Sequence, residues 1–169
     1  MTSEKKTPVA VVMGSDSDMA VMQGCIDTLK DFGINPAVRI ISAHRTPQIA
    51  ADFADKALEN GIKVIIAAAG MAAHLAGSLA GRTRCPIIGV PIASSDGGVG
   101  GLDALLSTVQ MPPGVPVATV AIGKAGAKNA AILAVQILSL FDDEMACKLD
   151  NFRAAQQQKV IEKDSALQG

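Results

Sequence analysis

Residues Val9 to Asp18 read VAVVMGSDSD, which combines a strand, a tight turn and the start of a helix. The first five residues form an apolar run rich in valine, a β-branched residue that favours strands. Gly14 permits the turn, and apolar residues then recur every three or four positions as far as Phe32, where a glycine follows as a helix stop. A strand followed directly by a helix is the repeating unit of an α/β protein.

The same unit recurs along the chain. Further strands are predicted at residues 37–41, 63–69, 86–92 and 115–122. The predicted helices lie at residues 18–32, 47–60, 71–80, 102–109, 127–141 and 144–163. Strands that are apolar almost throughout are typical of a parallel sheet covered by helices on both faces. With right-handed crossovers, the pattern predicts a flavodoxin-like, doubly wound three-layer sandwich. Its central parallel five-stranded sheet would have the order 2-1-3-4-5, and a C-terminal helix would follow.

The 169 residues are predicted to form a single domain, with a core at about residues 8–141 and a C-terminal helix at about residues 144–163. The composition is 49% hydrophobic and only 18% charged, which excludes a disordered chain. This excess of apolar residues predicts apolar surface that copies of the chain cover in a homo-oligomer.

Charge and hydropathy exclude other partners. The formal net charge is −1 and there is no basic stripe, so no nucleic-acid partner is expected. Two uncharged runs, 64–81 and 104–123, are long enough to span a membrane, but glycines or prolines interrupt both, and no membrane segment is predicted. The three cysteines are far apart and lack zinc-type spacing, so we expect no metal and a reducing, cytoplasmic setting.

Ligands of a doubly wound sheet bind beyond the carboxyl ends of its strands, so four loops are candidates for the site. The first contains Gly14, Ser15 and Asp18 at a helix start, where free backbone N–H groups favour an anion such as phosphate. The serine hydroxyl would add a donor, and Asp16 or Asp18 could hold ribose hydroxyls. The simpler alternative is that these side chains only cap the helix and complement its dipole.

The second loop, residues 42–46, reads SAHRT and holds His44, one of only two histidines in the chain. Thr46 is the predicted cap of the next helix. Arg45 stands beside that helix start, where a cation is unfavourable unless it meets a bound anion, and guanidinium suits phosphate. His44 can donate or accept a proton near neutral pH. Most surface histidines have no such role, but this one follows a strand at the expected ligand edge.

The third loop, residues 70–74, begins with Gly70 and small residues, so its backbone can approach a ligand closely. Its histidine, His74, either lines the pocket or is an ordinary helix residue. The fourth loop, Ser94 to Gly101, ends in four glycines among five residues and is either a flexible lid or a tight backbone cradle. The motifs of dinucleotide folds, P-loops and serine hydrolases are absent.

Six segments of the chain read, in order, VVMGSDSD, SAHRTP, AAHLAG, GVPI, STVQMPPGVPVATVAIGKAG and NAAILAVQIL. This ordered set, which covers residues 9 to about 141, resembles the N5-carboxyaminoimidazole ribonucleotide mutase family, also called the catalytic subunit of phosphoribosylaminoimidazole carboxylase. The resemblance implies a flavodoxin-like octamer, an isomerase of purine (IMP) biosynthesis. The implied reaction moves a carboxylate from the exocyclic nitrogen of an aminoimidazole ribonucleotide to ring carbon 4, by decarboxylation and recarboxylation, without metal, cofactor or ATP.

By position in these motifs, the resemblance implies that His44 is the general acid and base. The residues implied to bind the nucleotide substrate are Gly14, Ser15, Asp18, Ser42, Arg45, Gly70, Ala72, Ala73 and His74. Among these, Ser15, Asp18 and Arg45 would hold the ribose phosphate. His74 and the backbone after Gly70 would line the region of the carboxylate and carbon dioxide.

Two other functions remain open. A sister class carboxylates the aminoimidazole ribonucleotide directly with carbon dioxide, but it tends to have SAHKT and to lack the second histidine. A flavodoxin-like module that binds nucleotide without turnover is the third alternative. The sequence departs from the family's pattern at Met71, where the family tends to have glycine, at Ala76, where it tends to have proline, and in the loop from Ser94 to Gly101.

Overall fold

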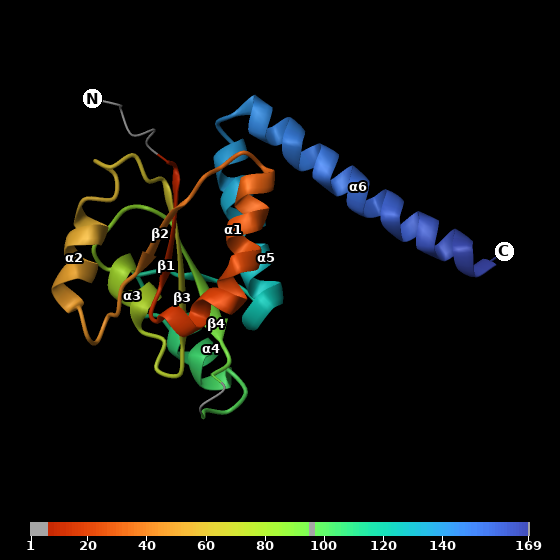
Figure 1. Cartoon of the computed structure of the whole chain (residues 1–169). Helices are drawn as coiled ribbons and strands as arrows, with labels where there is room; N and C mark the ends of the chain where they lie inside the picture. The colour runs from red at the N-terminus through yellow and green to blue at the C-terminus, as the bar shows by residue number, and fades with distance from the viewer. Residues whose placement is uncertain (1–6, 95–96, 169) are drawn as a thin grey trace. The chain divides into compact units, whose positions relative to one another are not determined.

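The computed structural model describes residues 7–94 and 97–168. Its strands are β1 (Val9–Met13), β2 (Ala37–Ile40), β3 (Val64–Gly70), β4 (Ile87–Ile92) and β5 (Ala118–Thr119). They pair in parallel within one sheet, in the order β2-β1-β3-β4-β5 (Figure 1). The predicted fold class and strand order are confirmed.

The helices are α1 (Met19–Asp31), α2 (Pro47–Asp55), α3 (Leu75–Ala80), α4 (Leu102–Val109), α5 (Gly123–Ser139) and α6 (Asp143–Gln168), and a short 3-10 helix, η1 (Asp16–Asp18), precedes α1. Figure 1 shows α2 and α3 on one side of the sheet and α1 on the other. Lys128 at the start of α5 lies against Gly24, so this end of α5 packs beside α1. Thr108 of α4 and Ala76 of α3 both face Gly89, so α4 lies on the same side as α3.

The chain divides into two compact units, Met1–Ala134 and Val135–Gly169. The first contains the sheet, helices α1 to α4 and most of α5. The second contains the end of α5 and the long helix α6, in which Leu149 is the one buried side chain among those described. The single domain over residues 1–169 stays a prediction.

The core of the first unit is made by the three central strands and the helices on both faces. Every side chain of β1 and β4 is buried, as are the first five of β3. Burying one valine, leucine or isoleucine side chain contributes about 1.5–3 kcal/mol. Alanines such as Ala50 and Ala54 of α2 pack in the same cluster as Leu75 and Leu79 of α3, and their small size allows close packing. The site is therefore supported by a rigid sheet.

The edge strands differ from the prediction. β5 covers only Ala118–Thr119, where residues 115–122 were predicted, because ladder pairing with β4 is confined to these two residues. β2 is present, but Val38 and Ile40 are 38% and 54% exposed, although the apolar run predicted a strand covered on both faces. As an edge strand, β2 has a neighbour on one side only and is incompletely covered.

Several helix limits also differ from the prediction. α2 ends at Asp55, and residues 56–61 form turns instead of its last part. α3 begins at Leu75 because residues 71–74 form a turn. α5 begins at Gly123 rather than at residue 127, and α6 continues to Gln168, past residue 163 where the predicted C-terminal helix ends. In residues 7–94 and 97–168, no helix combines the length and the apolar character needed to cross a membrane.

Gly126 lies so close to the carbonyl of Ala121 that an added Cβ would overlap it. We therefore expect Gly126→Ala to lower the free energy of unfolding by about 3 kcal/mol, because the backbone must move apart. Gly24→Ala is the matched control: its Cβ would meet only the Lys128 side chain at an ordinary 3.6 Å. That change should stabilise the chain by about 0.5–1 kcal/mol. Urea unfolding measures both variants, and equal stabilities would contradict this packing.

Candidate functional site

The loops that follow β1, β2, β3 and β4 meet at the carboxyl edge of the sheet, around a cleft of about 770 Å³. Most residues predicted from the sequence line this cleft, namely Gly14, Ser15, Asp18, Ser42, His44, Arg45, Gly70, Ala72 and His74. Ala73 is buried instead, at 2% exposed. The structure thus brings the predicted side chains together, and their catalytic and binding roles stay predictions.

The first loop is held by its own side chains. The Ser15 hydroxyl accepts the Ser17 N–H at 3.3 Å, and the Asp18 carboxylate accepts the Ser15 N–H at 3.2 Å. The capping alternative is therefore correct as a description of the local structure. It does not remove the loop from the cleft, because Ser15 and Ser17 both line it, with their hydroxyl oxygens 2.9 Å apart.

Asp18 is a buried acid at the edge of the cleft, only 7% exposed. Burial raises the pKa of its carboxyl above the ordinary value, and the nearby charge of Asp16 acts in the same direction. Hydrogen bonds from the backbone N–H groups of Ser15 and Gly14 oppose this rise. Asp18 therefore fixes the turn that carries the serine hydroxyls.

The second loop closes on itself through Thr46. Its hydroxyl accepts the Ser42 N–H at 3.0 Å and donates to the Ser42 carbonyl at 3.0 Å. Thr46 occupies the predicted cap position of α2, with Pro47 as the first helical residue, but its side chain makes no capping hydrogen bond to that helix. The predicted position of the cap is therefore confirmed, but the Thr46 hydroxyl is used inside the loop and does not cap the helix.

Arg45 connects the second loop to the first. Its guanidinium donates to the carbonyl of Gly14 at 3.3 Å, and its backbone N–H donates to the Ser42 hydroxyl at 3.1 Å. The cation is thus held beside the serine-containing turn and next to the start of α2. This position fits the predicted meeting of a guanidinium with an anion bound at the helix start.

The two histidines meet in the cleft although 30 positions separate them in the sequence. Nε2 of His44 lies 2.9 Å from Nδ1 of His74, with ring centroids 5.0 Å apart and planes at 78°. When both rings are neutral, one of these nitrogens must donate the proton that the other accepts. Of the two alternatives for His74, the structure favours a residue of the cleft.

The third loop contains an unusual backbone conformation. Met71 has φ of 55°, in the left-handed region, which is uncommon for a long side chain. Its carbonyl accepts the Ala73 N–H at 2.9 Å, and the next turn is closed by the His74 N–H donating to Ala72 at 2.8 Å. These bonds aim the chain from β3 into α3 and place His74 at the helix start.

Some residues of the site were missed by sequence reasoning. Val21, Leu75 and Ile92 add apolar lining to the cleft. The Ser107 hydroxyl of α4 donates mainly to the Asp103 carbonyl at 2.6 Å and also lies 3.4 Å from the Met71 carbonyl, so it contacts the third loop. Ile92 ends a strand and could have been found by the rule that ligands bind there. No local signal indicates Ser107, because its contact joins residues far apart in the sequence.

The fourth loop is only partly described, since Ser95 and Asp96 lie outside the described residues. Ser94 lines the cleft. The glycines at 97, 98, 100 and 101 all have positive φ, which explains why this loop has so many of them, and Gly101 is the N-cap of α4. Across residues 7–94 and 97–168, no group of three or more His, Cys, Asp or Glu side chains is placed to hold a metal ion.

Comparison with known proteins gives matches over nearly the whole chain. The sequence profile of AIR carboxylase matches residues 8–159. The chain is 50% identical over 159 residues to the N5-carboxyaminoimidazole ribonucleotide mutase of Bacillus subtilis, covering 94% of this chain and 97% of that protein. It is 51% identical over 157 residues to the mutase of the same name from Brucella melitensis, covering 93% and 96%. Its fold is similar to the crystal structure of Treponema denticola PurE, with a TM-score of 0.84, 36% identity and coverage of 95% and 98%.

The buried carboxyl of Asp18 makes a prediction about pH. Because its folded pKa is raised, the folded chain holds the proton over a range where the unfolded chain has lost it, so this group lowers stability as pH rises through that range. Asp18→Asn keeps an oxygen to accept the Ser15 N–H and cannot ionise. We expect the stability of the variant relative to the wild type to increase as pH rises above about 4, the ordinary pKa of an aspartate side chain.

Urea unfolding at about pH 4 and at about pH 7 measures the difference in stability between Asp18→Asn and the wild type. Asp27→Asn, at an exposed position of α1, is the control for removing one carboxylate. A difference between Asp18→Asn and the wild type that is the same at both pH values would contradict the assignment.

Proposed function

Because the chain belongs to the AIR carboxylase family, we propose that it is the N5-carboxyaminoimidazole ribonucleotide mutase of purine (IMP) biosynthesis. The reaction moves a carboxylate from the exocyclic nitrogen to ring carbon 4. One observation carries the proposal: a single cleft holds a pair of histidines in contact and an arginine beside a serine-containing turn. Relatives about half identical to this chain carry the mutase name over nearly their full length.

The ribose phosphate would bind where the first and second loops meet. Arg45 supplies a guanidinium that the Gly14 carbonyl and the Ser42 hydroxyl already orient. The hydroxyls of Ser15 and Ser17 now donate to Asp16 and to Ser15, and by rotating toward the phosphate they would supply further donors. The first N–H groups of α2 are not capped by Thr46, and a helix N-terminus favours an anion. A guanidinium with oriented neutral donors is suited to phosphate.

The proton balance of the reaction suits one histidine. Breaking the bond between nitrogen and the carboxylate carbon releases carbon dioxide, and the bonding pair returns to nitrogen, which takes up one proton. Carbon 4 then attacks carbon dioxide to form the new carbon–carbon bond, and the hydrogen on carbon 4 must leave as a proton. His44 would deliver the first proton and accept the second, so no proton is gained or lost overall.

His74 is suited to assist His44. With Nε2 of His44 only 2.9 Å from Nδ1 of His74, the two rings share one proton along this line when both are neutral. His74 would fix the orientation and tautomer of His44. Carbon dioxide would be held beside them by the small residues Ala69, Gly70, Ala72 and Ala93, whose side chains offer water no hydrogen bond.

The direct test uses purified protein and N5-carboxyaminoimidazole ribonucleotide, without ATP or added bicarbonate. We expect the isomer carboxylated at carbon 4 to form, and chromatography with mass spectrometry quantifies it. If only aminoimidazole ribonucleotide with bicarbonate gives this product, the chain is a direct carboxylase. Binding without turnover of either substrate would leave only the nucleotide-binding module.

Two variants separate the proposed roles. His44→Asn should abolish turnover while nucleotide binding persists, because it removes the group that carries the proton.

Arg45→Ala should weaken nucleotide binding by about 1.5–3 kcal/mol, the range for charge-assisted hydrogen bonds. Arg84→Ala, at an exposed position outside the cleft lining, should change neither property. Calorimetric titration with a ribose 5-phosphate nucleotide gives the affinities; full turnover by His44→Asn would disprove its role.

We also propose that the chain acts as an octamer in the cytoplasm. Leu102, Leu106 and Val109 are 46–49% exposed and follow the spacing of one helical face on α4. Such a stripe is suited to contact with another copy. The free thiols of Cys25 and Cys85 suit a reducing compartment. Light scattering should give eight times the mass of the 17.3 kDa chain, and a monomer mass would contradict the proposal.

A further inference from the structure

Met71 is the one residue other than glycine with positive φ among those described, at 55°. For residues with a Cβ this left-handed conformation costs free energy, and for a long side chain without a short polar group it is uncommon. Such strain persists only where the surrounding structure enforces it, and it concentrates at functional sites. The cost at Met71 therefore needs a compensating role.

The backbone contacts of this turn do not require methionine. The Met71 carbonyl accepts a hydrogen bond from the Ala73 N–H at 2.9 Å and a longer, shared one from the Ser107 hydroxyl at 3.4 Å. Both use main-chain atoms of Met71, which glycine would supply equally well and without strain. A role for the methionine side chain itself must therefore be sought in the cleft.

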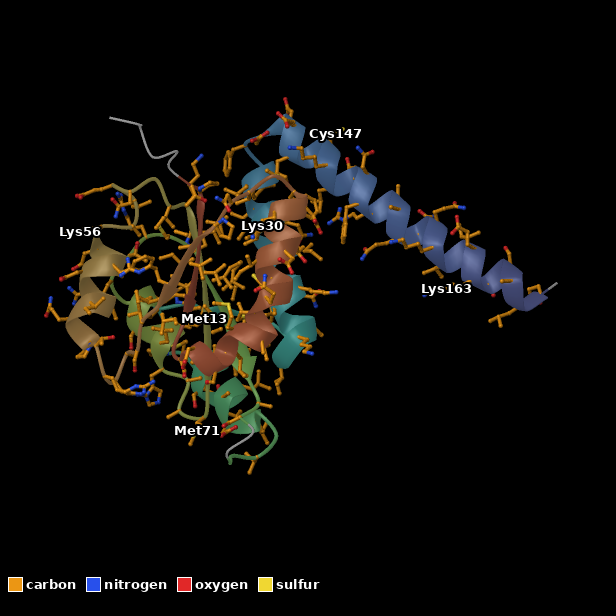
Figure 2. The ribbon with its side chains drawn as sticks, viewed as in Figure 1. Met13, Lys30, Lys56, Met71, Cys147 and Lys163 are labelled. Carbon is orange, nitrogen blue, oxygen red and sulfur yellow. The ribbon has the colours of Figure 1, made fainter. Side chains whose placement is uncertain are left out.

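The packing of the side chain does not compensate for the strain either. Met71 is 52% exposed, so half of its surface is left outside the protein core. Figure 2 labels Met71 near α4, at one end of the fold. Lys30, near the C-terminal end of α1, is labelled toward the opposite end. The residue lines the cleft, and its neighbours there are the small residues Gly70 and Ala72.

Its place in the loop makes Met71 the first position after β3 where a side chain is possible. At Gly70, an added Cβ would come within 3.1 Å of the Ile92 carbonyl, which leaves almost no room for a side chain. Ala72 carries only a methyl group, and Ala73 is buried. Within this loop, Met71 is the residue with a long apolar side chain, and it lines the cleft together with Ala69 and Gly70.

We propose that the thioether of Met71 covers the carbon dioxide released during the reaction and keeps it in the cleft until carbon 4 attacks it. The inference rests on the mutase function proposed above. Carbon dioxide is neutral and apolar, so no polar group can hold it strongly, and retention depends on a physical cover. A flexible and polarisable methionine can adapt to such a small molecule. The residue acts by retention and takes no part in proton transfer.

The test follows the carboxyl carbon itself. N5-carboxyaminoimidazole ribonucleotide labelled with carbon-13 in its carboxylate is converted in the presence of unlabelled bicarbonate and carbonic anhydrase. Mass spectrometry then gives the labelled fraction of the product. The wild type should keep most of its label. Met71→Ala should raise the rate of label loss relative to turnover by about fivefold, which corresponds to about 1 kcal/mol on the escape barrier.

Two further variants separate the side chain from the strain. Met71→Leu keeps an apolar chain of similar size and should retain the label almost as the wild type does. Met71→Gly removes the strain together with the side chain, so it should lose label like Met71→Ala and yet unfold at a higher temperature. Light scattering on each variant should give the wild-type mass.

Three results would overturn the inference. One is full label retention by Met71→Ala, and another is complete washout in the wild type. The third is an altered oligomer mass in Met71→Ala, since Met71 would then serve a contact between copies. Product that forms with washed-out label removes the retention role and leaves the mutase proposal intact. No product from the wild type removes both.

Discussion

Parallel pairing of β1 with β2 and with β3 is the constraint on which the site depends. The register places Met13 level with Ile40 on one side and with Ala68 on the other. One further hydrogen bond on each side, from the Ile41 N–H to Met13 and from the Gly14 N–H to Ala68, carries the alignment to the strand ends. β1 and β2 thus leave the sheet at the same height, and β3 leaves it two residues later, where Gly70 pairs with Ile92. Their loops must share one region of space, and the cleft follows from this.

The loops are ordered by their own hydrogen bonds. Asp18 holds the first turn and Thr46 closes the second, so both turns are ordered without a ligand. Arg45 then links the two turns through the Gly14 carbonyl. Groups that are already in place lose little conformational entropy on binding, which is the physical advantage of such an arrangement. The groups available for chemistry, above all the histidine pair, stand on turns with defined geometry.

The cleft has a polar half and an apolar half, and the division follows the order of the strands. The loops after β1 and β2 carry hydroxyls, a guanidinium and a carboxylate, which suit a charged nucleotide. The loops after β3 and β4 contribute mostly small apolar residues, which suit carbon dioxide. His44 and His74 come from the two halves and meet at their boundary. The proposed reaction would use both properties, because its substrate is polar and its proposed intermediate, carbon dioxide, is apolar.

The sequence by itself determined the fold class, the strand order and most of the cleft lining. Helix and strand periods are local, and parallel strands must end at one edge, so residues such as Ser15 and Arg45 could be assigned to one site. Tertiary structure alone decided the rest. Apolar runs predicted both β1 and β2, yet β1 is buried and β2 is partly exposed, because β2 lies at the edge of the sheet and has a strand on one side only. The contacts of His44 with His74 and of Ser107 with Met71 join distant residues. The left-handed conformation of Met71 opposes its local preference, and only the surrounding fold can impose it.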